Sequence, residues 1–293
     1  MSHPASINVR SVAAAGLRRL PPRTRRRVLH GLGRFAPWEQ GFDFTPPALE
    51  PGEEAGPPDF VGIGVQKAGT TWWYGLIVAH PSVSARPAIH KERHFLSRYA
   101  ATAFGAADVR DYHGWFPRRP GTLAGEWTPD YVDFPWVPPL LAQAAPRARL
   151  LLLVRDPVER FRSGLAHHKR HGLPVTDATM ADAVARGFYA RALTPWWSHF
   201  GPEALLVLQY ERCRADPAGQ LARTYRFLGL DDDFVPDALH RRVDPPAESR
   251  IDLAPDARRR LVDAYQPDVD ALTRRFPELD LDLWPNFAAR HVP

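Results

Sequence analysis

The sequence predicts an α/β fold in which one parallel sheet is flanked by helices. Apolar segments of strand length alternate with helical patterns, and their near-continuous apolar character is typical of strands buried on both faces. Proline and glycine stand where the helices should begin or end, at Pro81, Pro157 and Gly229. The predicted strands are residues 60–64, 150–154 and 205–209, and the predicted helices are 71–80, 157–169, 217–228 and 255–275. With 293 residues the chain can form a single large domain.

The composition is that of a soluble globular protein, with 44% hydrophobic and 24% charged residues. No apolar segment approaches the roughly 18 residues that a membrane span needs. Cys213 is the single cysteine, which excludes an intrachain disulfide and a cysteine-based metal cluster. We therefore expect a cytoplasmic location, and we expect no metal.

The positive charge is concentrated at the amino terminus. Eight of the 38 lysines and arginines lie within residues 1–37, whereas all 33 acidic residues lie beyond them. Residues 42–58, rich in proline and glycine, predict a linker. The expected division is an Arg-rich arm and linker at 1–58 and one domain at 59–293. The arm is interpreted as a solubilising tail, the alternative being a weak contact with a membrane surface or a polyanion.

The segment from 64 to 71, Gly-Val-Gln-Lys-Ala-Gly-Thr-Thr, joins the first predicted strand to the first helix. Glycines and a helix N-terminus at this position present backbone N–H groups to anionic oxygens, which predicts a phosphate site. Nucleotide-triphosphatase loops carry lysine directly after the last glycine, but here Thr70 follows Gly69 and the lysine is Lys67. A kinase on a related loop and a turn without any ligand are the alternatives at this point.

A second phosphate site is predicted at Arg155, which follows the strand at 150–154. The carboxyl edge of a parallel sheet is where α/β folds bind ligands, and a guanidinium suits phosphate. Asp156, Pro157 and Glu159 form an N-cap pattern with a capping box, so we interpret them as structural and not as magnesium ligands. The two strand ends thus offer two separate sites for anionic groups.

Several motifs, taken in order, resemble those of the sulfotransferase family, in particular its heparan-sulfate-type and bacterial branch. Residues 65–71 resemble the family's 5′-phosphosulfate loop, and 154–163 resemble its 3′-phosphate motif. The other matching segments are Lys-Glu-Arg-His-Phe at 91–95, Tyr-His-Gly-Trp-Phe-Pro at 112–117, Gly-Glu-Trp-Thr-Pro-Asp-Tyr at 125–131 and Tyr-Arg-Phe-Leu-Gly-Leu at 225–230. The resemblance covers about residues 60–285.

The resemblance implies a sulfotransferase fold like that of P-loop nucleotide kinases. It implies 3′-phosphoadenosine 5′-phosphosulfate (PAPS) as the donor, with adenosine 3′,5′-bisphosphate as the product. By the family's pattern Arg155 and Ser163 bind the 3′-phosphate. The residues expected to bind the 5′-phosphosulfate are Lys67, Ala68, Gly69, Thr70 and Thr71.

The resemblance also implies catalytic roles for Glu92, Lys67 and His94. Glu92 would be the general base, and Lys67 would stabilise the leaving phosphate. His94 would orient the acceptor or assist proton transfer. Without the resemblance, Glu92 is simply one residue of a charged surface segment at 90–94.

Acceptor contacts are expected from Glu126 and from Trp115 and Trp127, which could form an apolar or sugar-stacking wall. At residue 127 the chain departs from the carbohydrate-acting branch, which often has lysine there. Arg250 is the candidate for the family's basic donor loop near the C-terminus.

The expected partner is a small-molecule or saccharide acceptor, such as a sugar, a glycolipid or a natural product. A second class of function, polyanion or nucleic-acid binding through the arm, is the other alternative. The near-neutral charge beyond residue 37 argues against nucleic acid, since such proteins carry their positive charge on the folded face.

Overall fold

The computed structural model describes residues 45–86, 89–100, 103–240 and 251–288, so the arginine arm and Arg250 lie outside the described residues. Its strands are β1 (Glu54–Ala55), β2 (Phe60–Gly64), β3 (Pro117–Arg118), β4 (Gly125–Trp127), β5 (Arg149–Val154) and β6 (Leu205–Gln209). Its helices are α3 (Thr70–Val78), α4 (Ala106–His113), α5 (Val137–Ala144), α6 (Pro157–Arg170), α7 (Asp177–Ala185), α8 (Tyr189–Leu193), α9 (Tyr210–Ala215), α10 (Pro217–Leu228) and α11 (Pro255–Arg275). Short 3-10 turns include η2 (Leu96–Tyr99), η3 (Tyr131–Asp133), η4 (Thr194–Ser198), η5 (Pro202–Ala204) and η7 (Leu281–Leu283).

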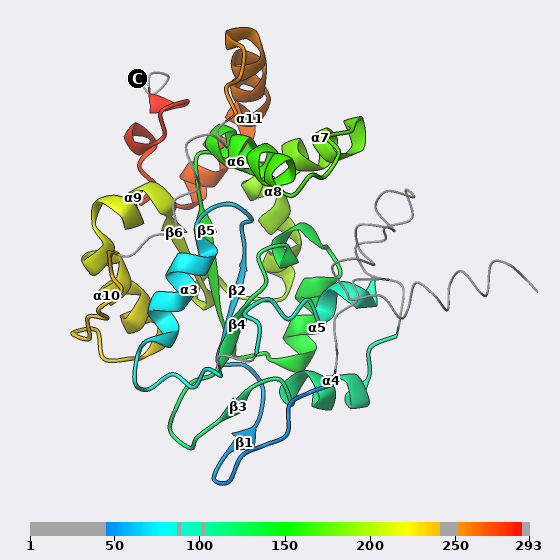
Figure 1. Cartoon of the computed structure of the whole chain (residues 1–293), viewed down its shortest axis with the longest axis vertical. Helices are drawn as coiled ribbons and strands as arrows, with labels where there is room; N and C mark the ends of the chain where they lie inside the picture. Colours follow the sequence, from blue (N-terminus) through cyan, green and yellow to red (C-terminus); the bar gives the residue numbers. More distant parts are fainter. Residues whose placement is uncertain (1–44, 87–88, 101–102, 241–250, 289–293) are drawn as a thin grey trace, which may run out of the picture.

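A four-stranded parallel sheet in the order β4-β2-β5-β6 forms the centre of the molecule. Every residue of β2 and β6 is buried, as expected of strands covered on both faces. Figure 1 shows α3 and α10 on one side of the sheet and α5 on the other. The predicted α/β class is confirmed.

The strands and helices with the strongest sequence signals match their predicted bounds. The strands at 60–64 and 205–209 and the helices at 217–228 and 255–275 agree residue for residue. The first helix was expected to reach residue 80, but α3 ends at Val78. Pro81 disfavours helical geometry at the residue before it, so the helix ends earlier.

Part of the predicted linker is packed against the domain. Glu54 and Ala55 form β1, which pairs antiparallel with β3. Glu53 is ion-paired with Arg86, and Pro58 is buried. The proline-rich composition therefore did not prevent this segment from joining the fold, because a two-residue strand needs few backbone hydrogen bonds.

The N-terminus of α6 confirms one half of the predicted capping box and corrects the other. Asp156 accepts hydrogen bonds from the backbone N–H groups of Val158 and Glu159, as an N-cap should. Glu159 does not return the bond, because the Asp156 N–H donates to Glu211 at 3.1 Å. Among the described residues, no helix is long and apolar enough to cross a membrane.

Candidate active site

The loop between β2 and α3 has the backbone geometry of an anion site. Lys67 and Gly69 both have left-handed backbone angles, with φ of 69° and 86°. A Cβ on Gly69 would lie 2.7 Å from the Tyr210 ring, so glycine is required there. No side chain caps α3, and its first turn holds no acidic residue. The N–H groups of that turn are therefore available to an anion.

Arg155 joins the two predicted phosphate elements. Its Nη1 donates a hydrogen bond of 3.1 Å to the carbonyl oxygen of Lys67. Its guanidinium carbon lies 4.9 Å from the centre of the Tyr210 ring, a cation–π distance. Its Nε is buried and has no hydrogen-bond partner in the described part of the chain. The guanidinium thus lies against the phosphate loop with donor capacity left for a ligand.

The charge of Lys67 is sensitive to its surroundings. Burial lowers its pKa to about 8, while the nearby carboxylate of Glu92 acts in the opposite direction. Arg170, Lys91 and other cations lower it further. A bound anion would remove part of this penalty, so the loop is suited to a ligand that brings negative charge.

Glu92 lies in an ion-paired cluster. Its Oε1 is 2.7 Å from Lys91 Nζ, and its Oε2 is 3.2 Å from His94 Nε2. Burial would raise the pKa of Glu92, but the hydrogen bond from His94 and the charge of Lys91 outweigh it and bring the pKa to about 2. The carboxylate is therefore ionised throughout the physiological pH range. About a quarter of its side chain is exposed, at 26%, which leaves it accessible to an acceptor.

His94 lies between two carboxylates. In addition to Glu92, its Nδ1 is 3.3 Å from Asp130 Oδ1. Burial opposes a charge on the ring, yet Asp130 and Glu92 together raise the pKa of His94 to about 9. The structure thus brings Lys67, Glu92 and His94 into one electrostatic cluster, with Lys91 and Asp130 added to it.

Two expectations for the acceptor wall are wrong. Trp127 is fully buried; its ring covers Gly62, and its Nε1 donates to the Gly64 carbonyl at 3.0 Å. Glu126 is also fully buried and accepts hydrogen bonds from Tyr112 and Thr128. Side chains alternate along a strand, so β4 buries one on each face of the sheet.

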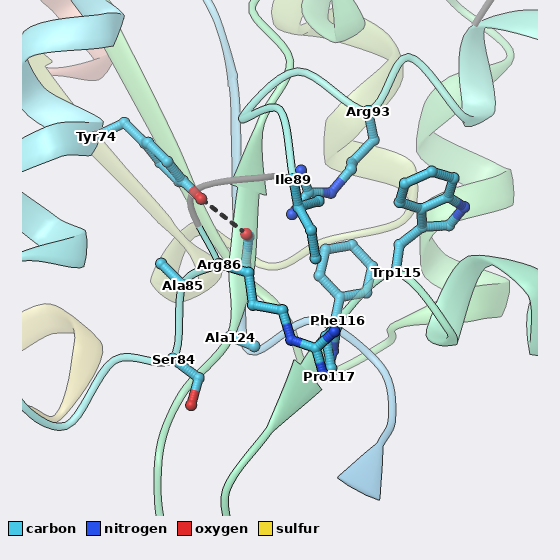
Figure 2. Close-up of a pocket in the computed structure, with 11 residues that line it drawn as sticks. Tyr74, Ser84, Ala85, Arg86, Ile89, Arg93, Trp115, Phe116, Pro117 and Ala124 are labelled. Atoms are coloured by element: carbon cyan, nitrogen blue, oxygen red, sulfur yellow. Dashed lines mark hydrogen bonds between the residues drawn. The ribbon is translucent and has the colours of Figure 1, made fainter. Parts of the chain in front are cut away.

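Trp115 lines a small open pocket, drawn in Figure 2 with Tyr74, Arg93 and Phe116. The Arg93 guanidinium carbon is 6.0 Å from the Trp115 ring centre and 5.7 Å from that of Phe116. None of the predicted donor or catalytic residues lines this pocket.

A match to a known protein family identifies the family to which this chain belongs. Residues 57–243 match the family described as the sulfotransferase domain. The chain belongs to the sulfotransferase family. Its fold agrees, because the crystal structure of a sulfotransferase from Alicyclobacillus acidocaldarius aligns with a TM-score of 0.63 and 25% identity. That alignment covers 78% of this chain and 98% of the other.

Curated sulfotransferases are also similar in sequence. Heparan sulfate glucosamine 3-O-sulfotransferase 3B1 of Mus musculus is 32% identical over 188 residues, which cover 59% of this chain and 46% of that protein. Bifunctional heparan sulfate N-deacetylase/N-sulfotransferase 3 of Homo sapiens is 26% identical over 198 residues, covering 59% and 22%. The chain therefore spans about half the length of the first of these relatives and less of the second. The family match decides against the kinase alternative.

The charged cluster and its surroundings include residues to which sequence reasoning gave no role. Asp130 follows β4, and Lys91 precedes Glu92. His167 lies one helical turn after Ser163 on α6, and burial together with the charge of Lys67 lowers its pKa to about 3. The spacing of four residues on a helix was the signal that could have found His167. Within the described residues no group of three or more His, Cys, Asp or Glu could hold a metal ion.

Proposed function

We propose that this protein transfers a sulfuryl group from PAPS to a hydroxyl or amine of an acceptor. One observation carries the proposal: Arg155 is hydrogen-bonded to the backbone of Lys67, so two basic elements from separate strand ends lie together, and the charge of Glu92 acts on Lys67. PAPS carries anionic groups at both its 5′ and 3′ ends. A donor of that shape needs two such elements, whereas a simple triphosphate needs one.

The chain has the groups that this donor requires. Lys67, Ala68, Gly69, Thr70 and Thr71 would hold the 5′-phosphosulfate with the uncapped N-terminus of α3. Arg155 would bind the 3′-phosphate, and its buried unpartnered Nε supports this role because a buried donor costs free energy until it is paired. Ser163, on the second turn of α6, would join Arg155 there.

The proposed reaction is an in-line displacement at sulfur. The acceptor oxygen or nitrogen forms a bond to sulfur while the bond from sulfur to the 5′-phosphate oxygen breaks, and that oxygen keeps the electron pair. Lys67 offsets the charge that develops on the leaving oxygen. Glu92 accepts the acceptor proton. Because its pKa is about 2 in the unliganded site, proton transfer should accompany sulfuryl transfer, when the acceptor proton becomes acidic.

The acceptor is proposed to be a saccharide or a small molecule. The names of the curated relatives report sulfation of heparan sulfate glucosamine, which makes an amino sugar the first acceptor class to test. Nucleic acid is not proposed as an acceptor or partner. The arginine arm lies outside the described residues, and no part of the proposed chemistry needs it.

Calorimetry in the presence of a chelator tests the donor assignment. We expect the protein to bind adenosine 3′,5′-bisphosphate without metal and to prefer it to ATP. A donor-fixed screen of glucosamine oligosaccharides, glycolipids and phenols, with mass spectrometry for one added sulfuryl group, then identifies the acceptor class. Binding that requires magnesium, or a preference for ATP, would refute the proposed function.

A further inference from the structure

The contacts of His94 favour two protons on its ring. Nε2 is within hydrogen-bond distance of Glu92 Oε2, at 3.2 Å, and Nδ1 is at ion-pair distance from Asp130 Oδ1, at 3.3 Å, without the alignment of a hydrogen bond. A neutral imidazole has one N–H and one lone pair, and its lone pair would face one of these carboxylates. Only the imidazolium makes both contacts favourable.

Because His94 and Asp130 are both buried, the attraction between their charges is strong. Exposure of the His94 side chain is 8% and that of Asp130 is 5%, so water screens little of the attraction between them. An unpaired carboxylate is disfavoured at such a position. Asp130 forms an ion pair with His94, whereas Asp133, three residues later, is paired with Arg186.

The backbone holds His94 in an unusual conformation. Its φ is 49°, in the left-handed region that residues other than glycine rarely adopt. Thr128 Oγ1 accepts hydrogen bonds from the N–H groups of Arg93 at 3.0 Å and of His94 at 3.3 Å. Thr128 and Asp130 belong to the same turn after β4. This turn therefore fixes both the backbone and the ring of His94.

We propose that Asp130 is a positioning residue for sulfuryl transfer, which holds His94 as a cation that in turn fixes the Glu92 carboxylate beside Lys67. The inference rests on the proposed function. It makes His94 an orienting cation and leaves Glu92 as the base, because neither nitrogen of the imidazolium can accept a proton.

The charged groups around His94 are consistent with this role. Glu92 and Lys91 lie on its own segment, Asp130 on the turn after β4, and Lys67 on the phosphate loop near Glu92. Behind Asp130, Arg186 is ion-paired with both Asp133 and Asp182. Asp130 and Glu92 raise the pKa of His94 to about 9 against the effect of burial.

Asp130→Asn tests the proposal, because it keeps the size of the side chain and removes the charge. With one carboxylate gone, the pKa of His94 should fall toward neutrality. At about pH 6 the ring stays protonated, so turnover with saturating donor should remain within about threefold of wild type. At about pH 8 the ring of the variant is neutral, and turnover should fall at least about tenfold. Affinity for adenosine 3′,5′-bisphosphate should change less than about twofold at either pH.

Two measurements are needed on the full-length protein. Nitrogen-15 NMR of the histidine rings gives the pKa of His94 without any acceptor, with His94→Gln identifying the resonance. Turnover of the acceptor found in the screen, followed against pH, gives the effect on catalysis. Asp133→Asn is the matched control, since it removes a partly buried carboxylate of the adjoining turn η3, and Arg186 keeps its ion pair with Asp182. It should leave the pKa of His94 and the shape of the pH profile unchanged.

The outcomes separate the inference from the proposed function. Asp130→Glu keeps the charge and should keep the wild-type shape of the profile, which makes the test independent of how well the asparagine variant folds. An unchanged pKa of His94 in Asp130→Asn, or an equal loss of turnover at both pH values, overturns the role of Asp130. Glu92→Gln should lose turnover at both pH values. If it stays active, Glu92 is not the base; if wild type sulfates no acceptor, the proposed function fails. In either case the NMR result still judges the pairing of His94 with Asp130.

Discussion

At the scale of single residues, the proposed chemistry depends on charges that are partly withdrawn from water. Lys67 has a strained backbone, and burial lowers its pKa to about 8. Glu92 and His94 are shifted in opposite directions, to about 2 and about 9, and burial opposes both shifts. The ion pairs of Glu92 and His94 therefore determine their protonation states, and a bound anion should change the protonation state of Lys67.

Donor binding should take up protons at about pH 8. In the free protein about half of the Lys67 side chains are neutral at this pH, and the anion raises the pKa so that nearly all become charged. About half a proton per site should be taken up, and affinity should weaken as the pH rises further. Calorimetry with adenosine 3′,5′-bisphosphate in buffers of different ionisation enthalpy measures this uptake.

Lys67→Arg is the matched variant for this measurement. It keeps the positive charge, but a guanidinium is protonated at every pH used, so proton uptake should disappear. A heat of binding for wild type that is the same in all buffers at pH 8 would contradict the pKa assigned to Lys67.

At the scale of elements, the structure shows which helices and strands could be predicted from the sequence. Long, uniformly apolar or strongly periodic segments such as β6, α10 and α11 were predicted with correct bounds. β4 was not predicted as a strand, because three residues are too few to show a period. The same limit applies to the candidate site, as the next residues show.

The motifs predicted a phosphate site after each of two parallel strands of one sheet, at the loop of residues 64–71 and at Arg155. The pairing of Asp130 with His94 could not be predicted in the same way. It depends on the left-handed backbone of His94 and on the turn after β4, neither of which leaves a local sequence signal. The burial of Glu126 and Trp127 was missed for the same reason, because it depends on how the edge strand packs.

The junction of β5 and α6 should be the element that recognises the 3′-phosphate. Arg155→Ala should weaken binding of adenosine 3′,5′-bisphosphate by about 10- to 100-fold, as expected for a charge-assisted hydrogen bond of about 1.5–3 kcal/mol. Binding of adenosine 5′-monophosphate should change much less, although the bond from Arg155 to the Lys67 carbonyl is also lost.

Arg155→Lys is the control for charge. It keeps the positive charge but not the planar guanidinium with its several N–H donors, so its affinity should lie between those of wild type and the alanine variant. Equal losses for the two nucleotides would place the 3′-phosphate elsewhere.

At the scale of the whole molecule, the proposed donor site is supported by residues close to the C-terminus. The backbone N–H and the side-chain amide of Asn286 both donate to Asp156 Oδ2, at 3.1 and 2.9 Å. Asp156 is fully buried, and it follows Arg155 and caps α6. The final turn of the described chain is thus part of the support of the phosphate site.

Asn286→Ala should lower the free energy of unfolding by about 1–3 kcal/mol, because the buried carboxylate of Asp156 loses the side-chain amide and keeps only backbone donors. Asn286→Asp should cost more, since it adds a like charge beside Asp156 and Glu159. Urea denaturation measures both. Asp282→Ala, at an exposed position of the same segment, should stay within about 0.5 kcal/mol of wild type. A neutral effect of Asn286→Ala would show that the bond from its side chain contributes little.

The contact of Trp127 with Gly62 has an evolutionary consequence. A Cβ at residue 62 would lie 2.0 Å from the indole ring, so with tryptophan at 127 even alanine is excluded at 62. A smaller residue at 127 would relieve that restriction but leave a cavity between β2 and β4. The two positions should therefore covary among descendants of this sequence. A lineage that replaced the tryptophan by a lysine would need to refill the space over Gly62, which makes a single-step exchange between the two forms improbable.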